Sequence, residues 1–189
     1  MIQQYRGMLG DFNYDDTEFI IDKMQGELYV KYIGNGERVR LPKGCKNCQY
    51  MFMGYTGKYL DLSEFYTDDV VSMKYMFAEC RNLEEIDLFN FNTDKVEKMG
   101  FMFKSCTNLK YLDLSMFNVS NVRDMSGLCF GCLSLQSIDI SDIGIINFAH
   151  EMFKHCNRLS YIKTSVLGYK YISLGCPLNI LKELECNKH

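Results

Sequence analysis

Short apolar stretches return along the chain at a fixed interval, separated by polar turns. One strand-like block spans residues 60–65, where Leu60 and Leu62 stand on either side of Asp61. Three similar blocks follow, each 26 residues after the one before, beginning at Ile86, Leu112 and Ile138. A unit of this length cannot bury its apolar side chains alone, so successive units must stack and share one core. The pattern predicts a solenoid.

Each repeat is expected to contain a strand followed by a curved return segment. Ile86 and Leu88 alternate with polar residues, which is typical of a strand with one buried face. Further on, Met99, Met102 and Cys106 follow one another at steps of three and four, which is typical of a helical or 3₁₀ face. We therefore expect an α/β solenoid with a parallel strand sheet on one face and short helical or 3₁₀ arcs on the other.

The repeats weaken at both ends of the chain, as capping units do. Two strand-like stretches, residues 27–32 and 37–41, flank a Gly-Asn-Gly turn at residues 34–36 and predict a hairpin. Towards the carboxyl end, Pro177 opens a segment with apolar residues on one side, which predicts a helix. We expect a single domain (1–189) made of an N-terminal hairpin cap (1–44), repeats (45–165) and a C-terminal helical cap (166–189).

The repeat blocks resemble the 26-residue repeat of the BspA-like branch of leucine-rich repeats, which occurs in bacterial surface proteins and mycoplasma lipoproteins. The clearest match runs from Leu60 to Cys132 and includes the turn segments 91–96 and 117–122. With weaker units, the resemblance covers roughly residues 45–165. It implies a leucine-rich-repeat-like solenoid that binds other macromolecules, and it carries over no catalytic residues.

Composition and charge narrow the class of partner. The chain has 189 residues, 47% hydrophobic and 24% charged, as in ordinary soluble globular proteins. Its net charge is −3, without the basic stripe of a nucleic-acid binder, and the basic residues within 38–46 are expected to form a solvated face. No apolar run reaches the about 18 to 20 residues that span a bilayer, and the amino terminus lacks a secretory signal pattern. We expect a cytoplasmic monomer that binds neither nucleic acid nor membrane.

The cysteines are expected to be reduced and structural. Four of the nine keep the repeat phase at a position that suits a small buried group, namely Cys80, Cys106, Cys132 and Cys156. Cys45 pairs with Cys48, and Cys129 with Cys132, at a metal-like spacing, but stacking would place the two pairs too far apart to share a zinc ion. A redox role for the first pair is the open alternative. With His150 and His155 expected at the surface, we expect no metal, cofactor or catalytic site.

The outward positions of the strand blocks form columns across the repeats. One column is acidic and comprises Asp61, Asp87, Asp113 and Asp139. Like charges at this spacing repel and raise one another's pKa, unless hydrogen bonds or cations compensate. Two interpretations stay open, because these carboxylates could bond neighbouring backbone and serine hydroxyl groups or could form a binding surface.

The strand face also departs from its own pattern, and such departures favour binding over packing. Phe89 stands where the other blocks have serine, and Met116 lies beside it one coil further on. With Tyr59 and Tyr111 they would form an exposed patch inside an acidic rim, as in protein-binding hot spots, unless Phe89 folds over the edge of the core. The predicted partner-binding residues are Tyr59, Asp61, Glu84, Glu85, Asp87, Phe89, Tyr111, Asp113, Met116 and Asp139.

These patterns together predict a non-enzymatic protein-interaction module that acts through its strand face. One version is an intracellular binder, an inhibitor or effector of phage or bacterial origin, whose partner has a basic surface. The alternative is a bacterial cell-surface adhesin-type repeat protein.

Overall fold

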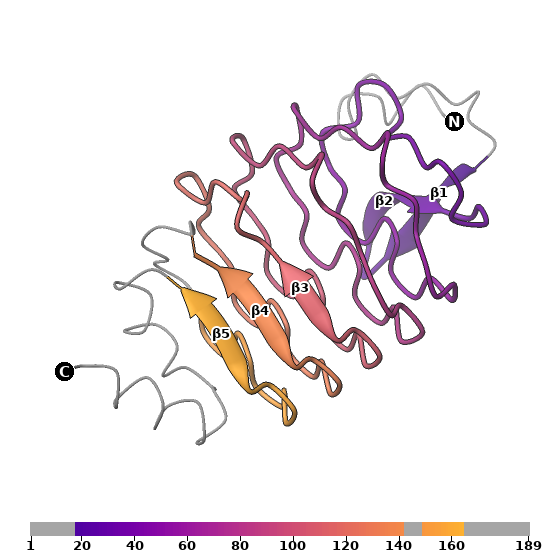
Figure 1. The fold of residues 1–189 in the computed structure, drawn as a ribbon. Helices are drawn as coiled ribbons and strands as arrows, with labels where there is room; N and C mark the ends of the chain where they lie inside the picture. Colours follow the sequence, from indigo (N-terminus) through magenta and orange to yellow (C-terminus); the bar gives the residue numbers. More distant parts are fainter. Residues whose placement is uncertain (1–17, 142–148, 165–189) are drawn as a thin grey trace.

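The backbone winds as a stack of coils around one hydrophobic core (Figure 1). The computed structural model describes residues 18–141 and 149–164. Within these residues, one cluster of buried apolar side chains extends from Phe19 to Ile162. Phenylalanine rings at equivalent places in successive coils stack on one another, with centroids 5.2 Å apart for Phe52 and Phe77 and 5.4 Å apart for Phe77 and Phe103. The stacking of repeats that the sequence predicts is therefore present.

A parallel sheet forms on one side of the later coils (Figure 1). Its strands, in spatial order, are β3 (Tyr111–Asp113), β4 (Ser137–Ile140) and β5 (Tyr161–Thr164). Leu112 pairs with Ile138 and Ile138 with Ile162, and all of these side chains are buried. The residues before and after them point outward, as the alternation of the sequence predicts.

The earlier coils follow the same path without regular strands. Residues 58–62 and 84–88 were expected to form strands like the later ones, but they do not. Only the N–H of Glu84, which donates to the carbonyl oxygen of Lys58 at 3.0 Å, joins these two segments through the backbone. The prediction that every coil begins with a strand is therefore wrong for these two coils, because a regular ladder needs repeated bonds to a neighbour.

A hairpin covers the amino-terminal end of the stack, but its strands are not those that the sequence suggested. β1 (Phe19–Met24) pairs antiparallel with β2 (Glu27–Tyr32) through a two-residue turn, Gln25-Gly26, in which both residues have positive φ. Residues 37–41 do not pair with β2. The N–H of Val39 instead donates to the carbonyl oxygen of Asp61 at 2.9 Å, so this segment pairs with the first repeat.

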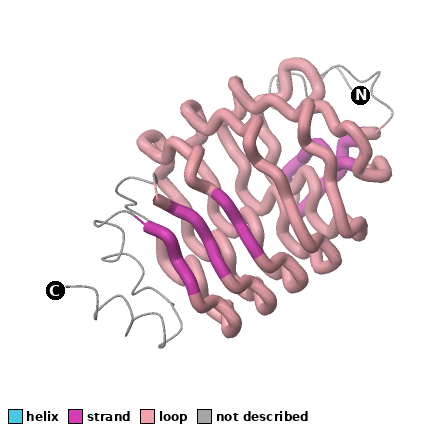
Figure 2. The backbone as a smooth tube through the Cα atoms, viewed as in Figure 1, coloured by secondary structure: helices cyan, strands magenta, loops and turns pink. Residues whose placement is uncertain are grey.

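The return segments of the coils are ladders of turns rather than helical arcs. Figure 2 shows no helix in the described part of the chain, and the prediction of an α/β class with helical or 3₁₀ arcs is wrong there. In residues 75–80, alternate N–H groups close turns three residues back, whereas the others bond to the next coil. Met76 donates to the carbonyl of Met73 at 3.1 Å, while Phe77 donates to that of Met102 at 2.8 Å.

Left-handed residues explain why no helix forms. Tyr75 (φ 56°) and Glu79 (φ 61°) each occupy the third position of a turn, where a type II turn requires positive φ. The same conformation returns in the neighbouring coils, at Tyr50, Gly54, Phe101, Ser105, Gly127, Gly131, Glu151 and His155. A left-handed residue at every fourth position turns the alternate N–H groups towards the next coil, so no continuous helix can form.

The column cysteines, Cys80, Cys106, Cys132 and Cys156, are buried and free, as predicted. Each thiol donates to a backbone carbonyl oxygen of the preceding coil, as from Cys80 to Phe52 at 3.1 Å and from Cys106 to Phe77 at 3.1 Å. These contacts help to hold coil to coil inside the core. The C-terminal helical cap predicted for residues 166–189 lies outside the described residues, and the single-domain organisation stays a prediction.

Candidate functional site

The strand face carries a row of exposed apolar side chains. Tyr59, Phe89, Tyr111 and Met116 are 62%, 73%, 57% and 64% exposed. Phe89 therefore does not fold over the edge of the core. Tyr161 on β5, which is 58% exposed, extends the row and was missed by sequence reasoning. Tyr161 could have been found by extending the repeat by one more coil. Tyr111 pairs with Ser137 and Ser137 with Tyr161, so the three residues occupy equivalent positions in successive strands.

The aspartate column has a structural role in every repeat. Asp87 Oδ1 accepts the N–H of Phe89 at 2.9 Å, which fixes the turn after the strand segment. The other aspartates accept the equivalent N–H in the same way, as the pairs Asp61 with Ser63, Asp113 with Ser115, and Asp139 with Ser141. The interpretation that these carboxylates bond backbone and serine groups is therefore supported, while their binding role stays a prediction.

Hydrogen bonds offset the repulsion expected along this column. Those from the side chain and backbone of Ser63 lower the pKa of Asp61 below its ordinary value. Burial by itself would raise the pKa of Asp139, but hydrogen bonds from Lys163 and Ser141 outweigh burial and lower that pKa. Lys163 Nζ lies 2.7 Å from Asp139 Oδ2, so a cation from the next strand also compensates the charge here.

An ion pair joins two coils beside the aspartate column. Lys58 Nζ lies 2.9 Å from Glu84 Oε1, and this contact lowers the pKa of the Glu84 carboxyl group. Glu85 projects outward and is exposed, as predicted. In contrast to Glu84, the residues Glu85, Asp87 and Asp113 form no ion pair within the described parts of the chain. The middle of the face therefore carries three acidic groups without a direct ion pair, although Lys163 acts on Asp113 from a longer distance.

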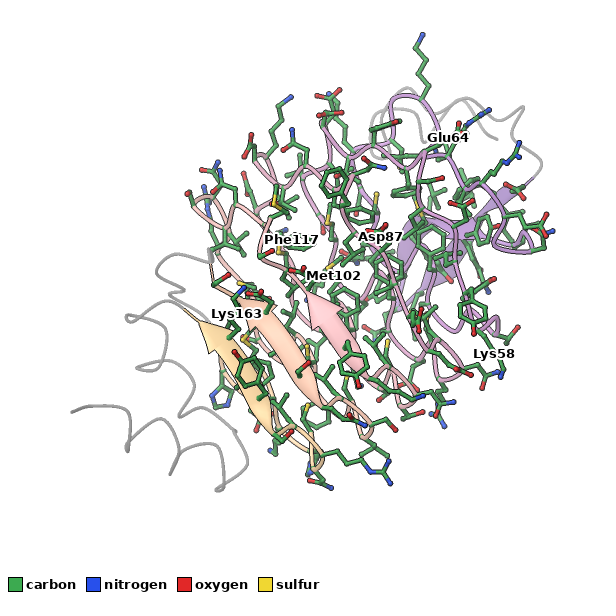
Figure 3. The ribbon with its side chains drawn as sticks, in the orientation of Figure 1. Lys58, Glu64, Asp87, Met102, Phe117 and Lys163 are labelled. Carbon is green, nitrogen blue, oxygen red and sulfur yellow. The ribbon has the colours of Figure 1, made fainter. Side chains whose placement is uncertain are left out.

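A hollow lies on the strand face between two coils that are joined through their return segments but not through this face. Among the described residues, no backbone hydrogen bond joins residues 84–89 to residues 110–116, although the coils on either side are bonded. The hollow has a volume of about 130 Å³. It is lined by Ile86, Asp87, Leu88, Phe89, Asp113, Met116 and Phe117. Figure 3 labels two of these lining residues, Asp87 and Phe117, near the middle of the stack.

A second, more open hollow lies over β3, β4 and β5, with a volume of about 240 Å³. Tyr111 and Tyr161 stand at its sides, with Ser137 between them in the register of the sheet. Lys163 and Asp139 form their ion pair in its wall. The face therefore presents two hollows, and Asp113 lines both of them. The second hollow is also lined by a basic side chain, Lys163, whereas the first is lined by none.

Other candidate chemistry is placed apart from this face. The described residues contain no group of three or more His, Cys, Asp or Glu side chains that could hold a metal ion. A hydrogen bond from Cys48 lowers the pKa of the Cys45 thiol, but both side chains are buried. His150 and His155 are exposed, as predicted. The basic residues Arg38, Arg40, Lys43 and Lys46 are exposed too, and Arg40 forms an ion pair with Glu64.

One solved structure shares the fold of this chain. Among solved structures, a leucine rich cell surface protein from Faecalibacterium prausnitzii A2-165 is similar, with a TM-score of 0.57 and 19% identity over 86% of this chain and 42% of that one. This chain thus spans less than half of that protein. A leucine rich repeat protein of T. pallidum, TpLRR, has a TM-score of 0.49 and 16% identity, over 94% of this chain and 96% of its own.

At 19% identity, the likeness to the Faecalibacterium protein shows the fold alone, which is leucine-rich-repeat-like. No curated protein matches the sequence. No helix among the described residues is long and apolar enough to cross a membrane. A family described as mycoplasma protein of unknown function, DUF285, matches residues 46–165, which include all the repeats and the whole strand face. The chain therefore belongs to the DUF285 family of mycoplasma proteins.

Proposed function

We propose that this chain is a non-enzymatic protein-binding module, related to BspA-like repeats, that contacts its partner through the strand face. The observation that carries the proposal is the row of large apolar side chains on that face. A side chain such as Phe89, 73% exposed, gains free energy when a partner covers it, and aromatic residues beside a hollow are typical of binding hot spots.

The charge of the face supports a partner with a basic surface. Asp87 and Asp113 line the hollow beside Phe89, Glu85 is exposed on the same face, and none of the three acids has an ion pair in the described residues. Acidic groups at the rim of an interface steer a basic protein towards it and speed association. The continuous core from Phe19 to Ile162 supports a module that acts as a monomer, because the coils bury one another's apolar side chains.

Two placements of the module are compatible with this surface. In the first, it acts inside a cell as an inhibitor or effector of phage or bacterial origin. In the second, it is part of a surface adhesin, a placement favoured by its likeness in fold to a cell surface protein. Digestion of intact source cells with an added protease separates the two, because only a surface-exposed chain is cleaved before the cells are lysed.

The function is tested by comparing two matched variants with the parent. Phe89→Ser introduces the residue that stands at Ser63 and Ser115, so the turn should be kept. Tyr66→Ser removes an aromatic side chain that is 59% exposed and lines neither hollow. The parent captures binding proteins from a lysate of the source cell, and the affinity of each variant for a captured protein is measured by surface plasmon resonance.

We expect Phe89→Ser to weaken binding by about 2 kcal/mol or more, which is roughly a 30-fold rise in Kd. Tyr66→Ser should bind like the parent. Charge reversal of Glu85 should mainly slow association and reduce its dependence on salt. If Phe89→Ser and the parent bind equally, the strand face is not the site, and the basic cluster at Arg38 and Arg40 becomes the next candidate.

A further inference from the structure

We infer that the hollow between Phe89 and Met116 receives an arginine side chain of the bound protein. This inference rests on the proposed function and names the chemistry that the partner presents to the strand face. It is drawn from the interruption of the sheet, the composition of the hollow's walls and the pattern of ion pairs on the same face.

The interruption supplies the opening. Coils elsewhere on this face are joined, by the bond from Glu84 to Lys58 on one side and by the ladder of β3, β4 and β5 on the other. Between residues 84–89 and 110–116, the described backbone has no such bond. The resulting hollow of about 130 Å³ has the room of about four water molecules at about 30 Å³ each, enough for a guanidinium group and the end of its stem.

The walls combine an apolar floor with two carboxylates. Ile86, Leu88 and Phe117 supply apolar contacts, and Asp87 and Asp113 supply the charge. In each aspartate, Oδ1 accepts a backbone N–H at 2.9 Å. The described residues offer no hydrogen bond to either Oδ2 atom, so two carboxylate oxygens at the hollow can accept bonds from an incoming cation.

The chain itself shows how a cation is placed over this column. One coil beyond Asp113, Asp139 stands in register with Lys163 of the next strand, and Lys163 Nζ lies 2.7 Å from Asp139 Oδ2. At the hollow, neither Asp87 nor Asp113 forms an ion pair with a described side chain, and Lys163, which pairs with Asp139, acts on Asp113 only from a longer distance. A basic side chain of the partner would complete there the pairing that the chain makes for itself at Asp139.

The residues that line the hollow favour an arginine side chain over an apolar side chain or a lysine. An apolar side chain would remove water from Asp87 and Asp113 without pairing them, which costs free energy. A lysine would pair with them, but its ammonium group is compact and strongly hydrated. A planar guanidinium group can stack on the exposed ring of Phe89 and donate to both carboxylates at once, while its stem packs beside Met116.

The test uses small probes and a reporter in the hollow. The protein is labelled with ¹³C at the methionine methyl groups, and the Met116 signal is assigned from its loss in Met116→Leu. N-acetyl-arginine methylamide is then titrated, with N-acetyl-citrulline methylamide as the neutral probe of the same shape and N-acetyl-lysine methylamide as the second cation. We expect a saturable shift of the Met116 signal with the arginine probe, in the millimolar range, and binding at least tenfold weaker with the other two.

Matched variants test whether the carboxylates of Asp87 and Asp113 bind the arginine probe. Asn retains the oxygen that accepts the backbone N–H, so Asp87→Asn and Asp113→Asn should keep the turns while each weakens the arginine probe at least threefold. Asp61→Asn, which changes a carboxylate with the same turn contact outside both hollows, should leave the probe's affinity unchanged. Equal binding of arginine and citrulline, stronger binding of lysine, or no saturable shift at Met116 would each overturn the inference.

The outcomes also separate this inference from the proposed function. If Phe89→Ser weakens binding of the captured protein but no arginine shift is seen, the strand face remains the binding site and the arginine assignment is wrong. If Phe89→Ser leaves that binding unchanged, the proposed function is wrong, and the inference about the partner falls with it even where the arginine probe binds.

Discussion

Truncation of Met102 tests the central claim that the stacked repeats share one packed core. Met102 is fully buried in the middle of the stack, and its carbonyl oxygen accepts the N–H of Phe77 from the preceding coil at 2.8 Å. Met102→Ala leaves this backbone bond possible and removes three side-chain atoms from the core. The change therefore probes packing and not the ladder between coils.

The expected cost has two parts. Loss of three buried, methylene-sized groups forfeits about 2 kcal/mol of transfer free energy at about 0.8 kcal/mol each. A cavity of about 60 to 80 Å³ that does not relax adds about 1.5 to 2 kcal/mol at about 24 cal/mol per Å³. We expect Met102→Ala to lower the free energy of unfolding by about 3 to 4 kcal/mol.

Met116→Ala is the matched control, because it makes the same substitution at a side chain that is 64% exposed. A surface change of this kind should alter the free energy of unfolding by less than about 0.5 kcal/mol. Both variants are unfolded in urea and followed by circular dichroism and by tyrosine fluorescence, since coincident curves are needed for a two-state free energy. A loss below about 1 kcal/mol for Met102→Ala, or equal losses for the two variants, would refute the shared core.

Three further predictions concern other features of the fold. The four column cysteines should react slowly with a thiol reagent in the native protein and rapidly in denaturant, and fast native labelling would show that the column is accessible. Gly54→Ala should lower the free energy of unfolding in urea by about 1 kcal/mol. The added Cβ would meet no atom within 4 Å, so the cost comes from the backbone alone, whose φ of +73° is unfavourable for alanine. An unchanged unfolding midpoint would contradict the left-handed turn. The pKa of Asp139 is lowered, since Lys163 and Ser141 outweigh burial, so its contribution to stability should be present above about pH 4 and lost as the pH falls further. Asp139→Asn should flatten that acid limb in unfolding curves from pH 3 to 7, and a limb of unchanged slope would show that Asp139 does not contribute to it.

The aspartate column shows which parts of the candidate site can be predicted from the sequence. The repeat phase alone places Asp87 and Asp113 on the outward side of neighbouring coils and predicts that Phe89 and Met116 lie close to them. All four line the same hollow. The interruption of backbone bonding that opens the hollow could not be predicted, because it depends on how two coils separated by 26 residues settle against each other.

The sequence by itself determined the repeat length, the stacking and the buried columns, because burial of apolar side chains depends mainly on which positions recur. Tertiary structure decided where the backbone hydrogen bonds go. A spacing of three and four residues fits both a helix and a ladder of turns, and the left-handed residues at Tyr75 and Glu79 select the ladder through bonds to the next coil. Tertiary structure also decided the pairing of residues 37–41. The local pattern indicates a hairpin with residues 27–32, but this segment bonds to Asp61 of the first repeat instead.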